Sequence, residues 1–555
     1  MSKSVWLIGW VLLGLSANIA TSLTIWGLDK SVDRQGIDAR ILQKPPYNLT
    51  GKDIFIGQVE LSRPTRFAVD KISNKLLQLD RAIVQPYEVF FRDHQAIPNK
   101  NIDDHSAQVA AVIISHHKIR RGVAPDAKLL SSAYSQRRQD GQPEACIAGQ
   151  YVARQYNSTV RAINFSFGEL LSEDPRPQPK LDGQALLTMC IDWLASNYNT
   201  LPIVAGNQGK GGIPIPTDLY NGFTVGFTHE VNGVYRQLDR GNLIDEPYLD
   251  RNGNDKYDFG EVFGDLNKDG KWTAGIESPS NGRRSLALLA PGNNLKLPTL
   301  QSKFKNANGS SFAAPHVVGT IALLHEYANR QIASGEWNID ARRHELIKAV
   351  LINSADKIED RGDGKILGMS RTIIDAFGKT WLDSEAYVNR TVPLSQSLGA
   401  GQINAHRAFW QYQAGQQSPI NGSANVKAIG WDTNIVEVDK YQDYVFNENL
   451  EADSFISATL AWDRQVKLND KNGNGLFDIG ESFSDLGFNK VELYLMRSQD
   501  TDISQSIWSS VSQVDNLQHI FIKIPATGKY KLRVAFPKTN FSNQRYGLAW
   551  WAKYN

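Results

Sequence analysis

The chain of 555 residues has little cysteine, no excess of one charge and no long apolar run beyond its first residues. Its two cysteines, Cys146 and Cys190, lie in apolar segments typical of helices, so the sequence favours two buried thiols, with a single disulfide as the alternative. Sixty basic residues against fifty-eight acidic ones leave a formal charge of +2, which gives no electrostatic case for nucleic acid or an anionic membrane as a partner. These features indicate an ordinary globular protein, and the length suggests more than one domain.

The first 22 residues differ in character from the rest. One lysine precedes an apolar run from Val5 to Leu15, and small residues follow it. A run of about a dozen apolar residues suits the core of a signal peptide and is short for a membrane span. We expect residues 1–22 to be a signal peptide or an N-terminal anchor. The remaining chain would then be secreted, periplasmic or attached to the cell envelope, with no other membrane contact.

Apolar strand patterns alternate with helical patterns from about residue 50 to 330, within a predicted first domain of residues 23–415 that carries an insertion at 248–280. The strand patterns cover 53–60, 127–134, 160–168, 201–207, 222–228 and 285–292. Such alternation predicts an α/β domain with a parallel sheet and helices on both faces. Ligands of such sheets bind at the carboxyl ends of the strands.

Residues 425–555 contain strand patterns without helices between them. In "YKLRVAF", Tyr530, Leu532, Val534 and Phe536 share one face, while the two basic residues share the other. This alternation predicts an antiparallel β-sandwich at the C-terminus.

Polar residues close three of the strand patterns in the first domain: Glu60, Ser166 and Asn207. His105 and Ser311 each open a helical pattern. A serine hydroxyl becomes a nucleophile when a histidine takes its proton, and an acid orients that histidine. An asparagine side chain can donate to the oxyanion that forms. A serine that only caps a helix is the simpler alternative for Ser311.

Four short motifs carry a resemblance to a known family. The segment "GSSFAAPHVVG" resembles the serine segment of the subtilisin-like serine proteases, or subtilases. "DDHSAQVAAVI", followed by "RGVAPDAKL", resembles their histidine segment. "VAGNQG" resembles their asparagine segment, and "INFSFG" resembles the strand that binds substrate. The resemblance implies that Ser311 is the nucleophile, His105 the base and Asn207 the oxyanion donor. It also implies that Ser166, Phe167 and Gly168 bind an extended substrate by β-addition.

The acid position departs from the family pattern. Where the family has aspartate followed by T-G or S-G, this chain reads "IGQVELS" with Glu60. We expect Glu60 to be the acid of a Ser–His–Glu triad, with its carboxylate within about 3.2 Å of His105 Nδ1. Asp103 and Asp104 are rival acids, although residues at a helix start more often cap it. A solvated Glu60 and a broken triad are the other alternative.

The resemblance implies a serine endopeptidase that hydrolyses polypeptide substrates through an acyl-enzyme, and we expect a monomer. A catalytically inactive binding or scaffold protein on the same fold is the alternative. An α/β-hydrolase is disfavoured because it needs G-x-S-x-G and the order serine, acid, histidine. A sedolisin-type site would not need the histidine that this chain supplies.

Two near-identical segments, 250–265 and 470–485, have the spacing of EF-hand-type loops. Calcium prefers six or seven oxygen ligands, with a backbone carbonyl at position 7 and a glutamate at position 12. The candidate ligands are Asp250, Asn252, Asn254, Lys256, Asp258 and Glu261 in the first loop, and Asp470, Asn472, Asn474, Leu476, Asp478 and Glu481 in the second. A partial third loop offers Asp265, Asn267 and Asp269, but Glu277 falls one residue late. We expect structural Ca²⁺ in the two full loops, with metal-free turns as the alternative.

Overall fold

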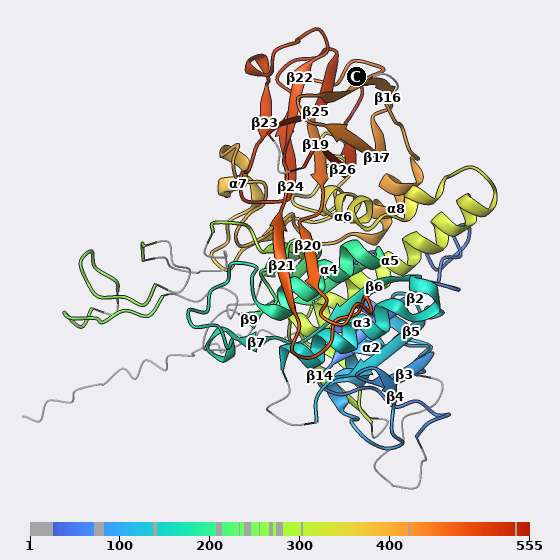
Figure 1. Ribbon diagram of the computed structural model, residues 1–555. Coiled ribbons are helices and arrows are strands. Elements are labelled where there is room, and N and C mark those ends of the chain that lie inside the picture. The colour runs from blue at the N-terminus through green and yellow to red at the C-terminus, as the bar shows by residue number, and fades with distance from the viewer. Residues whose placement is uncertain are drawn as a thin grey trace, which may run out of the picture.

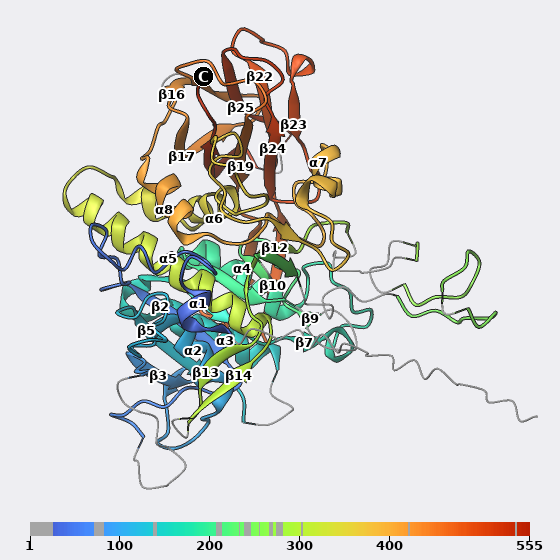
Figure 2. The same ribbon diagram turned by 180° about the vertical axis from the view of Figure 1, so that it is seen from behind.

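The computed structural model describes residues 26–70, 83–136, 141–206, 214–231, 233–237, 246–254, 256–265, 270–272, 281–300, 303–419, 422–538 and 541–555. Figure 1 shows a helix-covered central sheet below a C-terminal group of strands, and Figure 2 shows the same arrangement from behind. Within these residues, no helix combines the length and apolar character needed to cross a bilayer.

The central sheet has the strand order β15-β11-β10-β8-β6-β2-β5-β3-β4, with β12 beside β10. Its strands are β2 (Phe55–Glu60), β3 (Glu88–Phe91), β4 (His94–Gln95), β5 (Lys128–Ala133), β6 (Val160–Phe165), β8 (Leu201–Ala205), β10 (Phe223–Val231), β11 (Val234–Gln237), β12 (Leu286–Pro291) and β15 (Ile373–Ile374). The pairings from β10 through β8, β6, β2 and β5 to β3 are parallel, as are those of β12 with β10 and of β15 with β11, whereas β4 pairs with β3 and β11 with β10 in antiparallel fashion. The α/β class predicted from the alternation is therefore confirmed, with antiparallel additions near the edges.

Helices cover both faces of this sheet. On one face, α3 (Gln142–Ser158) and α4 (Leu186–Tyr198) pack together, and on the other α2 (Asp104–Ile114) packs against α5 (Ser310–Ala333). Apolar residues on these helices interlock with strand residues that are buried on both faces, such as Ile56 and Val59 of β2. The continuous apolar strands of the sequence reflect this double cover.

The remaining helices and short strands join the layers. They are β1 (Trp26–Gly27), α1 (Leu28–Ser31), β7 (Glu169–Leu170), β9 (Pro214–Ile215), β13 (Leu295–Pro298), β14 (Phe304–Ala307), α6 (His344–Asn353), α7 (Glu385–Val388) and α8 (Ala405–Gln413). The described residues also contain four short 3-10 helices: Leu171–Glu173, Ile339–Arg342, Trp381–Asp383 and Ile503–Gln505.

The C-terminal strands form the expected pair of sheets. One sheet contains β16 (Ser423–Val426), β18 (Tyr441–Phe446), β25 (Tyr530–Lys538), β22 (Lys490–Arg497) and β23 (Trp508–Ser510), and the other β17 (Ile429–Glu437), β26 (Asn543–Trp551), β19 (Phe455–Ala461) and β24 (Leu517–Lys523). All pairings are antiparallel except β16 with β18. The apolar face of β25 is buried as predicted, but Lys531 and Arg533 on its other face are buried too, because Asp443 forms ion pairs with both.

A long hairpin of the C-terminal region reaches back to the first domain. Strands β20 (Gln465–Asn469) and β21 (Ser482–Gly487) run down beside α3 and α4 in Figure 1. Phe477, in the loop between them, exchanges two backbone hydrogen bonds with the Gln150 side chain of α3, at 2.6 and 3.2 Å. Phe477 and Phe483 belong to the same apolar core as α3 and α4. The strand patterns of the sequence did not predict this hairpin.

Helix α6 lies against both C-terminal strands β19 and β26. At the closest point, a Cβ on Gly547 would lie 2.5 Å from Leu346 Cα, so only glycine permits this approach. The two parts of the chain are therefore packed backbone to backbone here.

The prediction of two buried thiols is wrong. Cys146 of α3 and Cys190 of α4 are both buried and form a disulfide with a Cα–Cα distance of 5.9 Å. The sequence shows that each cysteine lies on an apolar helix, but not that the two helices pack side by side on one face of the sheet. The bond closes a loop across a sequence separation of 44 residues.

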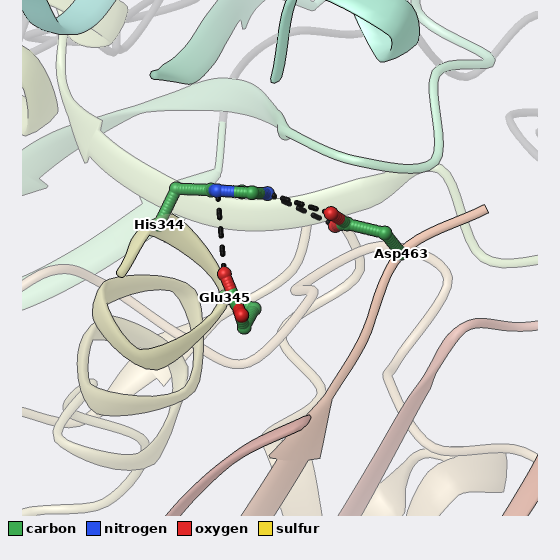
Figure 3. Close-up of side chains that lie close together, drawn as sticks. All are labelled: His344, Glu345 and Asp463. Atoms are coloured by element: carbon green, nitrogen blue, oxygen red, sulfur yellow. Dashed lines mark hydrogen bonds and ion pairs between the residues drawn. The ribbon is translucent and has the colours of Figure 1, made fainter. Parts of the chain in front are cut away.

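A buried histidine links α6 to the sandwich (Figure 3). His344 Nε2 lies 3.0 Å from both carboxylate oxygens of Asp463, just after β19. Its Nδ1 lies 2.9 Å from Asn199 Oδ1, which also accepts the His344 backbone N–H, and 3.3 Å from Glu345. Both ring nitrogens thus face acceptors, as in an imidazolium, so the histidine fits a proton-linked contact better than a metal ligand, although these three groups are close enough to surround a cation.

Burial alone would lower the pKa of His344, but the carboxylates of Asp463 and Glu345 more than offset this and raise the pKa above its usual 6.5. A raised pKa in the folded state stabilises the fold at pH values below the unfolded pKa of about 6.5, and this contribution is lost as the pH rises through the folded-state pKa.

We expect the free energy of unfolding to fall above pH 6.5 by about 1.4 kcal/mol for each unit by which the pKa is raised. Denaturant unfolding at several pH values measures this change in the free energy of unfolding. Lys348, whose pKa is lowered by burial to about 8, titrates in the same range, so the His344→Gln variant isolates the contribution of the histidine. His94→Gln, at an exposed histidine, is the control. Identical pH profiles for wild type and His344→Gln would contradict the account.

Candidate active site

The candidate residues meet at the carboxyl ends of three neighbouring strands. Glu60 ends β2, Ser166 follows β6, and Gly206 follows β8. These strands lie side by side in the order β8-β6-β2. The N-termini of α2 and α5, which carry His105 and Ser311, lie against this edge. This is the place where ligands bind to open parallel sheets.

The entry to α5 fixes which of the two serines is available. Gly309, just before the helix, has φ +138°, in the region that favours glycine. Ser310 Oγ donates a 2.6 Å hydrogen bond to the Gly206 carbonyl and is fully buried. Ser311 is 5% exposed, and its Oγ donates to the Ser166 carbonyl at a longer 3.2 Å. The geometry therefore favours Ser311 over Ser310 as the reactive hydroxyl.

Pro315 explains why Ser166 is tied to Ser311. In a regular helix the carbonyl of residue 311 accepts the N–H of residue 315, but proline has no N–H. The Ser311 carbonyl instead accepts a 2.9 Å hydrogen bond from Ser166 Oγ. Ser166 Oγ in turn accepts a 2.8 Å bond from the Asn164 side chain inside β6. The serine of the helix is thus held against the end of β6 by two reciprocal hydrogen bonds.

His105 lies between Glu60 and the start of α5. Its Nδ1 is 3.4 Å from Glu60 Oε2, slightly longer than the 3.2 Å that the sequence suggested, and the two groups form an ion pair. The His105 ring lies 5.5 Å, centroid to centroid, from the ring of Phe312, the residue directly after Ser311. The Glu60 side chain is 2% exposed, whereas that of His105 is 41% exposed. Glu60 therefore does not point into solvent.

The rival acids are engaged elsewhere. Asp103 caps α2, accepting the backbone N–H and the hydroxyl of Ser106 at 2.8 and 2.7 Å. Asp104 accepts the backbone N–H of Leu300 at 2.7 Å. The expectation that an aspartate at this helix start serves as a cap is confirmed for Asp103. Of the carboxylates in the described chain, Glu60 is the one paired with His105.

The electrostatics of the pair are set by burial. Burial raises the pKa of Glu60, and His105 partly offsets that rise. Neither carboxylate oxygen of Glu60 accepts a hydrogen bond of ordinary geometry from the described residues, so His105 is its main counter-charge. Burial would lower the pKa of His105, but the Glu60 carboxylate more than compensates, and the pKa of His105 is raised.

The other predicted site residues stand as follows. Asn207 lies outside the described residues, directly after Gly206. Phe167 packs against Tyr134, with ring centroids 4.7 Å apart. A Cβ on Gly168 would lie 2.6 Å from the Pro214 side chain, so glycine is needed where this segment passes β9. Ser166, Phe167 and Gly168 join β6 to β7, and Ser166 is hydrogen-bonded to Ser311 at the start of α5.

Two residues that position the site were missed from sequence. Gln58, buried inside β2, donates a 2.9 Å hydrogen bond to the Ser106 carbonyl at the start of α2. It joins the strand that carries Glu60 to the helix that carries His105. Asn164, also buried, supports Ser166. Polar residues inside otherwise apolar strand patterns are the signal that could have identified both.

The two full candidate calcium loops share one hydrogen-bond pattern. In each, the first aspartate accepts backbone N–H groups two and three residues later, and the glutamate at position 12 accepts those of positions 2 and 9. The two asparagines of each loop donate to the same carboxylate oxygen, Asp258 Oδ2 in the first loop and Asp478 Oδ2 in the second, at 2.6 to 2.8 Å. Side chains at positions 3, 5 and 9 therefore meet in both loops, whereas those at positions 1 and 12 accept backbone N–H groups of the same loop.

The loops differ in their surroundings. Residues 246–265 project from the body of the protein, in green in Figures 1 and 2, whereas residues 470–481 join β20 to β21 against α3. In the partial third loop, Asp265 accepts the Gly270 N–H at 2.9 Å. Asn267, Asp269 and Glu277 of that loop lie outside the described residues.

A comparison with known protein families gives a match that covers both His105 and Ser311. A sequence model of the subtilase family matches residues 85–370, which are 286 of the 555 residues and so just over half of the chain. This match contains His105 and Ser311 but begins after Glu60.

A curated relative, an intracellular serine protease of Paenibacillus polymyxa, is 22% identical over 265 residues, which are 47% of this chain and 66% of that protein. This chain thus spans just under two thirds of that relative's length. Two solved structures, that of the prenylagaramide maturation protease PagA and the crystal structure of MycP1 with the N-terminal propeptide removed, align with 67% of this chain and with 98% and 94% of their own. Their identities are 18% and 16%, and both TM-scores are 0.39, too low to carry an argument about the fold. On the strength of the family match, the chain belongs to the subtilase family of serine peptidases.

Proposed function

We propose that this subtilase is an endopeptidase that hydrolyses polypeptides through an acyl-enzyme, with Ser311, His105 and Glu60 as its triad. The observation that carries the proposal is the buried Glu60 carboxylate facing His105 Nδ1 beside the start of α5. The glutamate side chain is one methylene longer than the aspartate of the family, and its Oε2 here lies 3.4 Å from His105 Nδ1.

In this mechanism Ser311 Oγ leaves the Ser166 carbonyl and attacks the peptide carbonyl carbon while His105 Nε2 takes its proton. Glu60 holds the ring with Nδ1 protonated and stabilises the imidazolium that forms. His105 then gives the proton to the leaving amine, which departs with an acyl-enzyme on Ser311. Water, activated by the same histidine, hydrolyses the ester and restores the serine.

The oxyanion of each tetrahedral intermediate needs donors that are fixed before reaction. The Ser311 backbone N–H lies in the first turn of α5, where the helix dipole also favours negative charge. We propose the Asn207 side chain as the second donor, because residue 207 follows the Gly206 carbonyl that binds Ser310.

The alternative is a binding or scaffold protein on the same fold. The observation in its favour is the hydrogen bond from Ser311 Oγ to the Ser166 carbonyl, which directs the hydroxyl away from attack. Because that bond is long at 3.2 Å, it supports a resting state more than a disabled one.

We further propose that Ca²⁺ binds the loops 250–261 and 470–481 as a structural ion. The meeting of the side chains at positions 3, 5 and 9 in both loops supports this, as does the positive φ of Gly475, +74°, at position 6 of the second loop. Each asparagine would turn its amide oxygen inward to serve as a ligand.

Export across the cell membrane is the third proposal. It rests on the apolar run from Val5 to Leu15, and the disulfide between Cys146 and Cys190 supports it, because disulfides persist in oxidising compartments.

For the nucleophile, we expect Ser311→Ala to abolish labelling by a fluorophosphonate probe and peptidase activity with little change in thermal stability. Ser310→Ala should keep most of the labelling, because its hydroxyl only anchors the helix to Gly206. Active-site labelling followed by peptide mass spectrometry measures both. Labelling on Ser310, or none in the wild type, would contradict the assignment.

For the acid, we expect kcat/KM to rise with pH along a limb set by the raised pKa of His105, above 6.5, because only the neutral imidazole accepts the serine proton. Glu60→Gln removes the carboxylate, so the limb should move to lower pH and turnover should fall by roughly four orders of magnitude. Glu60→Asp should retain the position of the limb better than Glu60→Gln. A Glu60→Gln enzyme with wild-type rates would leave Glu60 without a catalytic role.

For the metal, chelation should lower the melting temperature, because an ion bound only by the folded state stabilises it by about 2.7 kcal/mol at one hundred times its Kd. Asp470→Ala should reproduce the loss in the second loop, with Asp93→Ala, at an exposed aspartate outside the loops, as the control. An unchanged melting temperature after chelation and calcium addition would refute the proposal.

For export, we expect the protein in the envelope or extracellular fraction of the producing cells, with no free thiol detected under denaturing conditions without reductant. Fractionation and thiol titration test this. A cytosolic protein with two titratable thiols would contradict both the export and the disulfide.

A further inference from the structure

Three polar side chains form a row across the central sheet, inside the apolar core. Ser131 of β5, Gln58 of β2 and Asn164 of β6 lie on neighbouring strands, and the register pairs Gln58 with both of the others. All three are fully buried. Residues two positions earlier in the same strands, such as Ile56 and Leu129, belong to the core that includes α2 and α5. Because side chains alternate between the faces of a strand, the row faces these two helices as well.

The partners of the two amides fix which end of each amide is which. Gln58 Nε2 donates to the Ser106 carbonyl at 2.9 Å, and a carbonyl can only accept. Asn164 Nδ2 donates to Ser166 Oγ at 2.8 Å, because the hydrogen of that hydroxyl goes to the Ser311 carbonyl. The atoms that remain on the two amides are therefore both oxygens, which are acceptors only.

Each of the three side chains in the row has one atom that needs a partner. Gln58 Oε1, Asn164 Oδ1 and Ser131 Oγ are buried, and none of them has a hydrogen-bond partner within the part of the chain that the structure describes. Two of these atoms are acceptors, and the third belongs to a hydroxyl that can donate. Buried polar groups of this kind are costly when unpaired, so they are bonded to protein or to ordered water in nearly all folded proteins.

One water molecule matches this set of atoms. Water can donate to both amide oxygens while it accepts from the serine hydroxyl, and a buried water typically makes about three hydrogen bonds. Two oxygens that each bond the same water at about 2.8 Å lie roughly 4.5 Å apart, close to the spacing of about 4.8 Å between neighbouring strands. A divalent cation fits less well, because two neutral amides and a hydroxyl bring no negative charge.

A water at this place completes a chain of hydrogen bonds between the two helices of the site. The chain begins at the backbone of α2 directly after His105 and passes through the Gln58 side chain to the water. From the water it continues through Asn164 and Ser166 to the Ser311 carbonyl in α5. The helix of the base and the helix of the nucleophile are then held together beneath the reacting side chains.

We propose that a buried water molecule, held by Gln58, Asn164 and Ser131, links α2 to α5, and that Ser131 is a positioning residue of the active site through this water. The kinetic part of the inference rests on the proposed peptidase function. The water site itself does not.

The first measurement is a high-resolution crystal structure of the full chain. We expect an electron-density peak for water within about 3.2 Å of Gln58 Oε1, Asn164 Oδ1 and Ser131 Oγ. A structure without this peak, or one in which Ser131 donates directly to Gln58, would overturn the proposal.

The second measurement is the steady-state kinetics of Ser131→Ala on a peptide substrate. The variant removes the hydroxyl that donates to the water, so we expect kcat to fall about tenfold with KM unchanged, because a small displacement of the base relative to the nucleophile affects the reaction more than substrate binding. Ser131→Thr keeps the hydroxyl and should restore most of the rate.

Ser132→Ala is the matched control. Ser132 follows Ser131 in β5 and faces the other side of the sheet, where its hydroxyl donates to the Arg92 carbonyl at 3.1 Å. We expect a wild-type kcat in this variant, and melting temperatures show whether each variant is folded. A wild-type kcat in Ser131→Ala, or an equal loss in Ser131→Thr or Ser132→Ala, would overturn the positioning role.

The two measurements separate this inference from the peptidase function. The water peak in a chain without peptidase activity would support the water site and refute the peptidase. Peptidase activity in a chain without the water peak would support the peptidase and refute the link between the helices.

Discussion

Two reciprocal hydrogen bonds between Ser166 and Ser311 hold the site together. The bond to the Ser311 carbonyl is possible because Pro315 lacks the N–H that would otherwise donate to that carbonyl. The bonds fix the N-terminus of α5 to the end of β6, with Glu60 at the end of the neighbouring strand. Ser311 is therefore placed by the packing of α5 on this sheet edge, whereas His105 is placed by α2 and Glu60 by β2.

Sequence reasoning succeeded where the signal was local or carried by a motif. The alternation of strands and helices gave the central sheet, and the period-2 pattern of residues such as Tyr530 and Leu532 gave the sandwich. The placement of Glu60 beside His105 was predicted from the rule that the carboxyl ends of parallel strands lie at one edge of the sheet, where ligands bind. Glu60 lies outside the family match, so its proposed role as the acid depends on the end of β2 and on the contact with His105.

The failures have a common cause, which is contact between distant segments. The Cys146–Cys190 disulfide needs two helices to pack side by side, and the hairpin β20–β21 owes its position to apolar contacts with α3 and α4. The roles of Gln58 and Asn164 likewise depend on what lies opposite each strand. In each case the residue type was visible in sequence, but its partner was not.

The central claim is that a glutamate completes the triad in place of the family aspartate. A crystal structure of the protein treated with a fluorophosphonate tests it most directly. The account predicts phosphorus bonded to Ser311 Oγ, with His105 Nδ1 within hydrogen-bond distance of a Glu60 oxygen in the adduct. An unmodified Ser311, or an adduct in which the Glu60 carboxylate has turned away from the ring, would contradict it.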